Sequence, residues 1–437
     1  MKYQTYPACK DSGVEWLGDV PEHWDVIQIK HLSAVQRGAS PRPIDDPKYF
    51  DDEGEYAWVR IADVSSSDGV LRETTQRLSN LGNALSVKIH SGELFISIAG
   101  TVGKPCMSAI KACIHDGFVY FPTLKIPPIF LYRIFEAGLC YGGLGKLGTQ
   151  LNLNTETIGA IRVALPNEKE LEHVLNFLDH ETAKIDTLIE KQQRLIELLK
   201  EKRQAVISHA VTKGLNPNAP MKPSGVEWLG EVPEHWIVKR LKHISPKIGV
   251  GLVINPSTYT RDEGVYFIFG GDVKEYKFDL STTRRISEED SNRLLPSRLN
   301  HRDLVCVRVG YPGITAVVTE ELEGSNCASV IVIRRGDYNS DWLCAAMNMW
   351  VGRQQVELAS YGAAQKQFNV ADVIEFIFPV PPKQEQNEIA DYVEKALVRF
   401  STLSELAYNQ IELLQERRTA LISAAVTGKI DVREWRD

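Results

Sequence analysis

Loops that could hold a reacting group are scarce in this sequence. A methyltransferase acting on a base amino group needs a (D/N/S)-P-P-(Y/F/W) loop, but the Pro-Pro pairs stand in IPPI at Ile126–Ile129 and VPPK at Val380–Lys383. A phosphate-binding loop needs G-x-x-x-x-G-K-(S/T), whereas YGGLGKLG at Tyr141–Gly148 has Leu after its Gly-Lys. We therefore expect no catalytic residue, and a turn or a loop facing nucleic acid at Tyr141–Gly148.

Histidine, cysteine and carboxylate patterns also lack the spacing of a metal site. His23 and His235 lie in two EHW repeats beside Trp24 and Trp236, where packing and capping roles are expected. The cysteines are scattered, odd in number and without a C-x-x-C pair, which favours reduced structural thiols over disulfides or zinc. No spaced carboxylate cluster resembles a nuclease metal site, so no metal is expected.

Cationic and aromatic residues in loops have the chemistry of nucleic-acid contacts. Lys and Arg bind phosphates, and Arg, Lys, Asn and Gln reach base edges. The candidate loops are Gln36–Tyr49 in the first half and Ile254–Gly264 in the second, with further candidates at glycine-rich turns. For any one residue, a solvated surface charge is the simpler alternative. The candidate DNA-binding residues are Arg37, Arg42, Lys48, Lys104, Lys146, Tyr259, Arg261, Arg308, Tyr311 and Lys366.

The elements that would position these loops occur twice. DSGVEWLGDVPEHW at Asp11–Trp24 matches PSGVEWLGEVPEHW at Pro223–Trp236 at 12 of 14 positions, which indicates an internal duplication. After each copy come about 130 residues that diverge further. Even there, a strand-like run precedes a glycine turn in both halves, aligning Gly100 with Gly310 and Gly103 with Gly313. A Gln and an Asn also recur before a β-rich run: Gln150 and Asn154, Gln365 and Asn369.

Two long amphipathic segments close the two halves. EKRQAVISHAVTKGL at Glu201–Leu215 is repeated as ERRTALISAAVTGKI at Glu416–Ile430. Apolar steps of three and four predict helices of about 44 residues, roughly 65 Å each. We expect them to pack antiparallel, with Gln192, Arg203 and Arg418 helping to fix the register. The predicted helix-pair core is Leu171, Leu175, Leu178, Ile185, Ile189, Ile196, Leu199, Val206, Val393, Leu397, Phe400, Ile411, Leu414 and Leu421.

The predicted fold class is α+β, with two mixed α/β domains joined by two long antiparallel helices and related by an internal pseudo-two-fold repeat. Such a chain would hold two divergent globules at a set separation, which suits duplex DNA with half-sites about one turn apart. The predicted boundaries are 1–167 for domain 1, 168–212 for its helix, 213–222 for a linker, 223–380 for domain 2, 381–428 for the second helix and 429–437 for a tail.

Composition is that of an ordinary globular protein, with 43% hydrophobic and 24% charged residues. No apolar run approaches the length of a membrane span, and Met1–Lys10 lacks a signal core, so a cytoplasmic location is expected. The net charge of -7 means that DNA binding must depend on local basic patches or on a partner.

The repeated SGVEWLG(D/E)VPEHW, the strand with a G-x-x-G turn, and PVPPKQEQNEIADYV at Pro379–Val393 followed by LLQERRTALISAAVTGKID at Leu413–Asp431 carry a family resemblance. The chain resembles the specificity (S) subunit of type I restriction–modification systems over essentially its whole length. The first half departs from this pattern, because Pro166–Val174 reads PNEKELEHV where the second half has PPKQEQNEI. Asn167 is a candidate N-cap there, with acidic residues in the first turn.

The resemblance implies two target recognition domains, each reading one part of an asymmetric bipartite site in double-stranded DNA. It also implies helical regions that set the gap and dock two methyltransferase (M) subunits, with restriction (R) subunits joining the complex. S-adenosylmethionine, ATP and Mg²⁺ would then bind the partner subunits, and this chain would bind no cofactor itself. The alternative is a non-catalytic, protein-binding scaffold with a coiled-coil spacer, which the acidic net charge favours.

Overall fold

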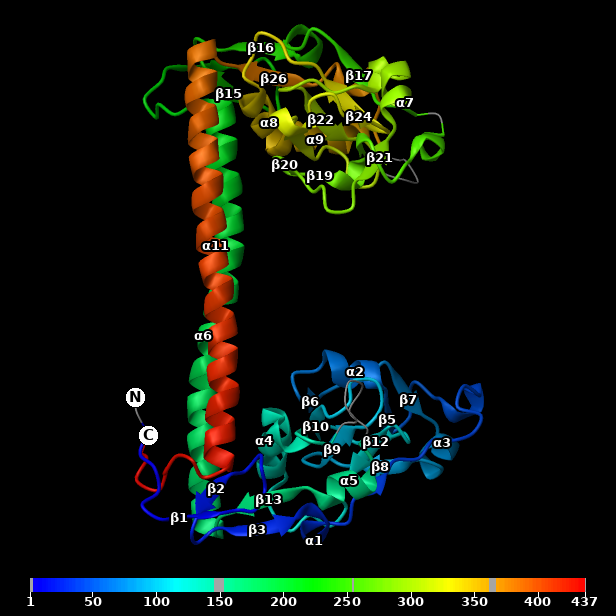
Figure 1. Cartoon of the computed structure of the whole chain (residues 1–437), viewed down its shortest axis with the longest axis vertical. Helices are drawn as coiled ribbons and strands as arrows, with labels where there is room; N and C mark the ends of the chain where they lie inside the picture. Colours follow the sequence, from blue (N-terminus) through cyan, green and yellow to red (C-terminus); the bar gives the residue numbers. More distant parts are fainter. Residues whose placement is uncertain (1–2, 145–152, 254, 361–366, 437) are drawn as a thin grey trace. The chain divides into compact units, whose positions relative to one another are not determined.

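The structure is a computed structural model in which residues 3–144, 153–253, 255–360 and 367–436 are described (Figure 1). The chain divides into two compact units. Unit 1 comprises Met1–Gln193 and Asn409–Asp437, and unit 2 comprises Arg194–Tyr408.

Two long helices are each shared by both units. Helix α6 spans Glu168–Lys213 (46 residues) and helix α11 spans Lys383–Val426 (44 residues), which confirms the two predicted long helices. In unit 1 the first half of α6 packs with the last half of α11, and in unit 2 the last half of α6 packs with the first half of α11. The helices are therefore antiparallel, as predicted.

Unit 1 contains two sheets whose central strands are fully buried. The strand orders are β4-β12-β9-β10-β6 and β7-β5-β11-β8, with two strand pairs, β1-β2 and β13-β3, closer to the long helices. The strands are β1 (Cys9–Asp11), β2 (Asp19–Pro21), β3 (Asp25–Gln28), β4 (Gln36–Arg37), β5 (Tyr56–Val59), β6 (Val70–Leu71), β7 (Gln76–Leu78), β8 (Val87–Ile89), β9 (Leu94–Ser97), β10 (Pro105–Ser108), β11 (Ala112–Ile114), β12 (Phe118–Tyr120) and β13 (Arg162–Leu165). The short helices are α1 (Ile29–Leu32), η1 (Pro47–Tyr49), α2 (Ile61–Ser66), α3 (Asn80–Ala84), α4 (Pro128–Ala137), η2 (Leu139–Tyr141) and α5 (Thr155–Ala160).

Unit 2 has the same architecture, with fewer strands in its two main sheets among the residues that the structure describes. Its sheets have the orders β17-β25-β22-β23 and β21-β18-β24, with the pairs β14-β15, β16-β26 and β19-β20. The strands are β14 (Met221–Pro223), β15 (Glu231–Pro233), β16 (Ile237–Arg240), β17 (Ile248–Val250), β18 (Val265–Ile268), β19 (Val273–Lys274), β20 (Lys277–Phe278), β21 (Arg284–Ile286), β22 (Leu304–Val307), β23 (Thr315–Val317), β24 (Asn326–Cys327), β25 (Val330–Ile333) and β26 (Ile377–Val380). The helices are η3 (Leu241–His243), η4 (Pro256–Tyr259), η5 (Gly270–Asp272), α7 (Glu288–Arg293), η6 (Leu295–Ser297), η7 (Glu320–Leu322), α8 (Ser340–Asn348), α9 (Trp350–Ala359) and α10 (Val370–Val373).

The duplication extends through the divergent globules. The order β4-β12-β9-β10 in unit 1 corresponds to β17-β25-β22-β23 in unit 2, and β7-β5-β11 corresponds to β21-β18-β24. The parallel pairs β11·β5 and β24·β18 also correspond, because each joins a strand that precedes the glycine-turn hairpin in the chain to the first strand that follows this hairpin. The predicted internal repeat is therefore confirmed at the level of sheet topology.

The paired glycine turns lie between equivalent hairpin strands, β9-β10 and β22-β23. Gly100 and Gly103 have φ values of 64° and 86°, and Gly310 and Gly313 have values of 89° and 90°. A side chain is strained in this left-handed region, so all four positions need glycine. The alignment made from sequence is confirmed by the backbone.

The two EHW repeats anchor the start of each long helix. His23 Nε2 lies 2.8 Å from Glu170 Oε2 in the first turn of α6, and His235 Nε2 lies 2.8 Å from Glu385 Oε2 in the first turn of α11. Asn167 Oδ1 accepts the Glu170 N–H at 3.1 Å, which confirms the predicted N-cap. The histidines thus have the packing and capping roles expected for them.

Candidate nucleic-acid interface

Strand β4 and the loop after it bring two candidate arginines of unit 1 to Asp116. Arg37 donates from Nε to the main-chain oxygen of Asp116, and Arg42 Nη2 lies 3.1 Å from Asp116 Oδ2. Ser40 Oγ donates to the other carboxylate oxygen at 3.2 Å. The Arg42 side chain remains 72% exposed, so its guanidinium can exchange this ion pair for a phosphate at little cost.

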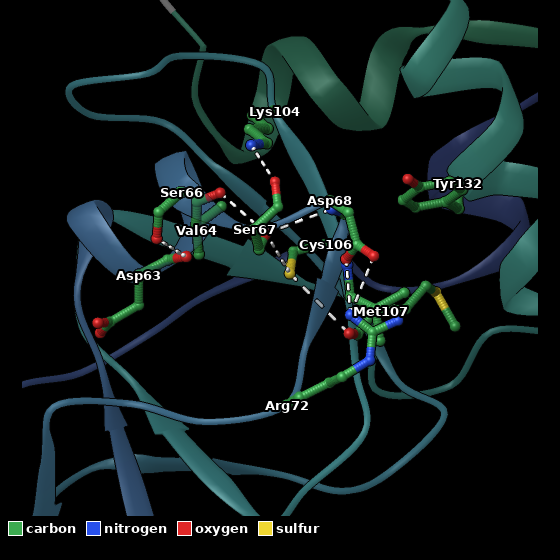
Figure 2. Close-up of polar contacts among 12 residues, drawn as sticks. Asp63, Val64, Ser66, Ser67, Asp68, Arg72, Lys104, Cys106, Met107 and Tyr132 are labelled. Carbon is green, nitrogen blue, oxygen red and sulfur yellow. Dashed lines mark hydrogen bonds and ion pairs between the residues drawn. The ribbon is translucent and has the colours of Figure 1, made fainter. Parts of the chain in front are cut away.

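Lys48 and Lys104 are held differently. Lys48 Nζ pairs with Asp46 Oδ2 at 2.7 Å on an exposed turn. Lys104 follows the glycine turn, and its ammonium donates to the main-chain oxygens of Ser65 (2.9 Å) and Ser67 (2.8 Å), as Figure 2 shows in part. These two carbonyls end helix α2, where a cation is stabilised by unpaired C=O groups. Lys104 therefore ties the turn to α2.

In unit 2, Arg261 braces its own loop. Its Nη1 donates to the main-chain oxygens of Thr258 (2.8 Å) and Thr260 (2.9 Å), and its Nη2 lies 3.5 Å from Asp290 Oδ2. Tyr259 ends η4 and is partly buried against a small cluster that includes Phe267. These contacts hold the shape of the loop and leave nearly half of the Arg261 side chain exposed.

The turn after β22 carries the other candidates of unit 2. Arg308 Nη1 donates to Asn369 Oδ1 at 3.4 Å, which links this turn to the N-cap of α10. Tyr311 is 81% exposed, which is unusual for so large a ring and leaves a face open for stacking. Lys146 and Lys366, with Gln150 and Gln365, lie outside the described residues.

Every residue of the predicted helix-pair core is buried or partly buried. The buried members are Leu171, Leu178, Ile185, Ile196, Val393, Leu414 and Leu421, and the partly buried ones are Leu175, Ile189, Leu199, Val206, Leu397, Phe400 and Ile411.

Sequence reasoning missed a shared scaffold inside the two globules. Gly38 follows β4 and Gly251 follows β17, and each donates its N–H to the first residue of the neighbouring strand, Phe118 or Val330, at 2.9 Å. A Cβ on Gly38 would lie 2.2 Å from the His115 carbonyl oxygen, and one on Gly251 would lie 2.6 Å from the Cys327 oxygen. Glycine at both places lets two sheets approach closely. The sequences Arg37-Gly38 and Val250-Gly251 share only the glycine, so the repeat cannot be recognised from sequence at this place and is seen only in the backbone structure.

The described residues do not form a metal or thiol centre. Among residues 3–144, 153–253, 255–360 and 367–436, no group of three or more His, Cys, Asp or Glu could hold a metal ion. All seven cysteines are free thiols, and six are buried. Burial raises the pKa of Cys106 to about 11 and the pKa of Cys113 to about 12, which makes both thiols unreactive at neutral pH. In the described part of the chain, no helix is long and apolar enough to cross a membrane.

The fold and its loops define a class: a duplicated pair of mixed α/β units that share two long antiparallel helices. The chain is similar to specificity subunits of type I restriction enzymes, which confirms the resemblance inferred from sequence. No family model matches the chain.

The relatives match at low identity but mostly over the full length. The putative MjaX specificity subunit of Methanocaldococcus jannaschii is 24% identical over 95% of this chain and 96% of its own length. The EcoKI specificity subunit of Escherichia coli is 20% identical over 96% of this chain and 91% of its own. The match to the Escherichia coli EcoBI specificity subunit, at 23% identity, spans 66% of this chain and 62% of the EcoBI subunit.

Solved structures show the same fold. A chain from a solved type I restriction–modification system has a TM-score of 0.68 at 15% identity, covering 93% of this chain and 98% of that chain. The HsdS subunit from Thermoanaerobacter tengcongensis has a TM-score of 0.51 at 13% identity, covering 94% and 98%. At such identities the likeness concerns the fold alone.

Proposed function

We propose that this chain is the DNA sequence-specificity subunit of a type I restriction–modification complex. Each unit reads one half of an asymmetric bipartite site, and the helix pair sets the gap and docks methyltransferase subunits. The observation that carries the proposal is that the two units share one sheet topology while their exposed loops differ, in a chain similar to specificity subunits along its length. One scaffold with two different surfaces suits two different half-sites.

The chain itself catalyses nothing in this proposal. Methyltransferase and restriction subunits supply the chemistry, and S-adenosylmethionine, ATP and Mg²⁺ bind those partners. The net charge of -7 fits this division, because binding of a phosphate backbone then depends on local cations and on the partner subunits. The proposed site of action is the cytoplasm.

A gel-shift comparison tests the proposal. The protein alone and the protein with its methyltransferase partner are titrated into a pool of duplexes with randomised sequence, and the bound fraction is sequenced. We expect the complex to select a bipartite motif with a fixed gap. Binding without any sequence preference in both samples would favour the protein-binding scaffold instead.

A further inference from the structure

Arg60 and Phe269 occupy equivalent positions in the two units. Arg60 directly follows β5 and Phe269 directly follows β18, the two strands that pair in parallel with β11 and β24. Each donates its main-chain N–H to a carboxylate three residues later, Asp63 Oδ2 at 2.8 Å or Asp272 Oδ2 at 2.7 Å. The backbone at this place is the same, but the side chain changes from a cation to an aromatic ring.

Gln76 and Arg284 are a second equivalent pair, on the adjacent edge strand. Gln76 is opposite Trp58 in the β5·β7 ladder, and Arg284 is opposite Phe267 in the β18·β21 ladder. Here the side chain changes from an amide to a cation.

The next residue of each edge strand shows that the alignment is correct. Arg77 and Arg285 are both arginine, and each donates to the carbonyl oxygen of an equivalent glycine, Gly54 or Gly264. Both glycines are held close to the edge strand, because an added Cβ would lie 2.0 Å from Leu78 O or 2.1 Å from Ile286 O. The scaffold is kept in both units, while the neighbouring side chains differ.

The two variable side chains meet in each unit. Arg60 Nη2 donates to Gln76 Oε1 in unit 1, and the Arg284 guanidinium lies over the Phe269 ring, 4.8 Å from its centroid, in unit 2. Each pair therefore contains one arginine. In unit 1 it is the residue after the central strand, Arg60, and in unit 2 it is the residue on the edge strand, Arg284. Both arginines are exposed, and each is oriented by its partner rather than by an ion pair.

A cleft adjoins this place in unit 1. It has a volume of about 670 Å³ and extends from α2 to Thr75, the residue before Gln76. Figure 2 shows part of its wall, where Ser66 and Asp63 lie on α2 and Arg72 Nη1 donates to Asp68 at 2.8 Å. The cleft is lined by both polar and apolar residues, among them Asp63, whose carboxylate accepts the Arg60 N–H, and Thr75, the neighbour of Gln76.

We propose that the pair Arg60 and Gln76 in unit 1, and the pair Phe269 and Arg284 in unit 2, determine which bases each unit reads. The inference rests on the proposed function and names the specificity-determining positions within it. An arginine fork matches the O6 and N7 acceptors of guanine, a glutamine amide matches adenine, and an aromatic ring contacts the thymine methyl group. Contact within each pair restricts the rotamers of the reading groups before DNA binds.

Transplanting one pair tests this inference. The double variant Arg60→Phe with Gln76→Arg gives unit 1 the pair of unit 2. In complex with the methyltransferase partner, it is used to select from randomised duplexes. We expect one half-site of the selected motif to change, with a loss of about tenfold or more in preference for an original base, while the other half-site and the gap stay the same.

Matched variants make the outcome decisive. Arg162→Gln removes an exposed arginine of β13 in the same unit and should leave both half-sites unchanged. Gln76→Glu keeps the side-chain shape but only accepts hydrogen bonds, so it should shift one base preference toward cytosine even if the double variant does not fold. If Gln76→Glu and the folded double variant both keep the wild-type motif, the assignment of these positions is overturned. If the wild-type complex selects no motif, the proposed function fails instead.

Discussion

Arg418 on α11 donates from Nη1 to Glu136 Oε1 on α4 at 2.9 Å. Arg133 donates to the other oxygen of Glu136 at 2.9 Å, so one carboxylate joins two arginines. Unit 2 repeats the arrangement with different elements: Glu275 accepts from Arg203 of α6 and Arg353 of α9. Arg203 and Arg418 are the arginines that the repeated helix endings place in register, and each ties a long helix to the globule of its own unit.

Removing either arginine should loosen one unit only. Arg418→Leu leaves Glu136 with Arg133 and the hydroxyl of Tyr132, which donates at 3.4 Å. The substitution also removes the hydrogen bond that Asp186 accepts from Arg418 Nε at 2.8 Å. We expect a loss of about 2 kcal/mol in the free energy of unfolding, since hydrogen bonds to charged groups contribute about 1.5–3 kcal/mol. Chemical denaturation followed by circular dichroism measures it. Arg399→Leu, an exposed change on α11, should stay within about 0.5 kcal/mol, and an equal loss there would contradict the role of Arg418.

The close approach at Gly38 and Gly251 gives a second stability prediction. An alanine methyl group at either position would overlap a carbonyl oxygen of the neighbouring sheet, so Gly38→Ala and Gly251→Ala should each cost about 2–3 kcal/mol. Gly249→Ala is the matched control, because its Cβ would meet nothing within 4 Å. Thermal unfolding midpoints of the three variants check the expectation. If all three variants unfolded at the same temperature, an alanine methyl group would be accommodated at Gly38 and Gly251, and the predicted overlap would be wrong.

The sequence could predict the long helices because their apolar stripe is a local pattern that a single neighbouring helix satisfies. It could predict the Gly100 and Gly310 turns because positive φ leaves glycine as the favoured residue. It could not predict Gly38 and Gly251, whose φ values are not positive and whose constraint comes from a sheet more than 70 residues further along the chain. Likewise, the sequence around Lys104 predicts only a surface cation. Its role in capping α2 depends on contacts with the carbonyls of Ser65 and Ser67, which lie more than 35 residues earlier in the chain.

The cysteines should fall into two reactivity classes. Cys9 is exposed, and the other six thiols are buried. Burial raises the pKa of Cys140 to about 12 and of Cys306 to about 11, so neither forms thiolate near pH 8. Ellman's reagent at pH 8 should therefore titrate one thiol in the native protein and seven after denaturation. The control variant Cys9→Ser should lose the fast reaction of the native protein. Rapid reaction of more than one thiol in the native protein would contradict the burial of the other six.

His115 should make stability depend on pH. Burial lowers its pKa below the usual value of about 6.5, and its Nδ1 accepts the Gly117 N–H at 2.8 Å. The folded state therefore favours neutral His115, so this stability is fully present above about pH 6.5 and is lost as pH falls through the lower folded-state pKa. His115→Asn removes the titrating ring, but the asparagine side-chain oxygen can still accept the Gly117 N–H. Denaturant midpoints at pH 7 and pH 5 should differ less in His115→Asn than in wild type, whereas the exposed His31→Asn should behave as wild type.

The continuity of α6 and α11 across the unit boundaries gives the test of gap setting. One heptad inserted between Gln193 and Arg194, and another between Tyr408 and Asn409, lengthens both helices where the units divide and keeps the apolar stripe in phase. The insertion adds about 10 Å of helix, equal to about three base-pair steps. The methylated motif, mapped genome-wide, should keep both half-sites and gain a wider gap. A heptad inserted in the exposed loop at Asn218 should leave the gap unchanged. Altered half-sites with an unaltered gap would show that the helix pair does not measure the spacing.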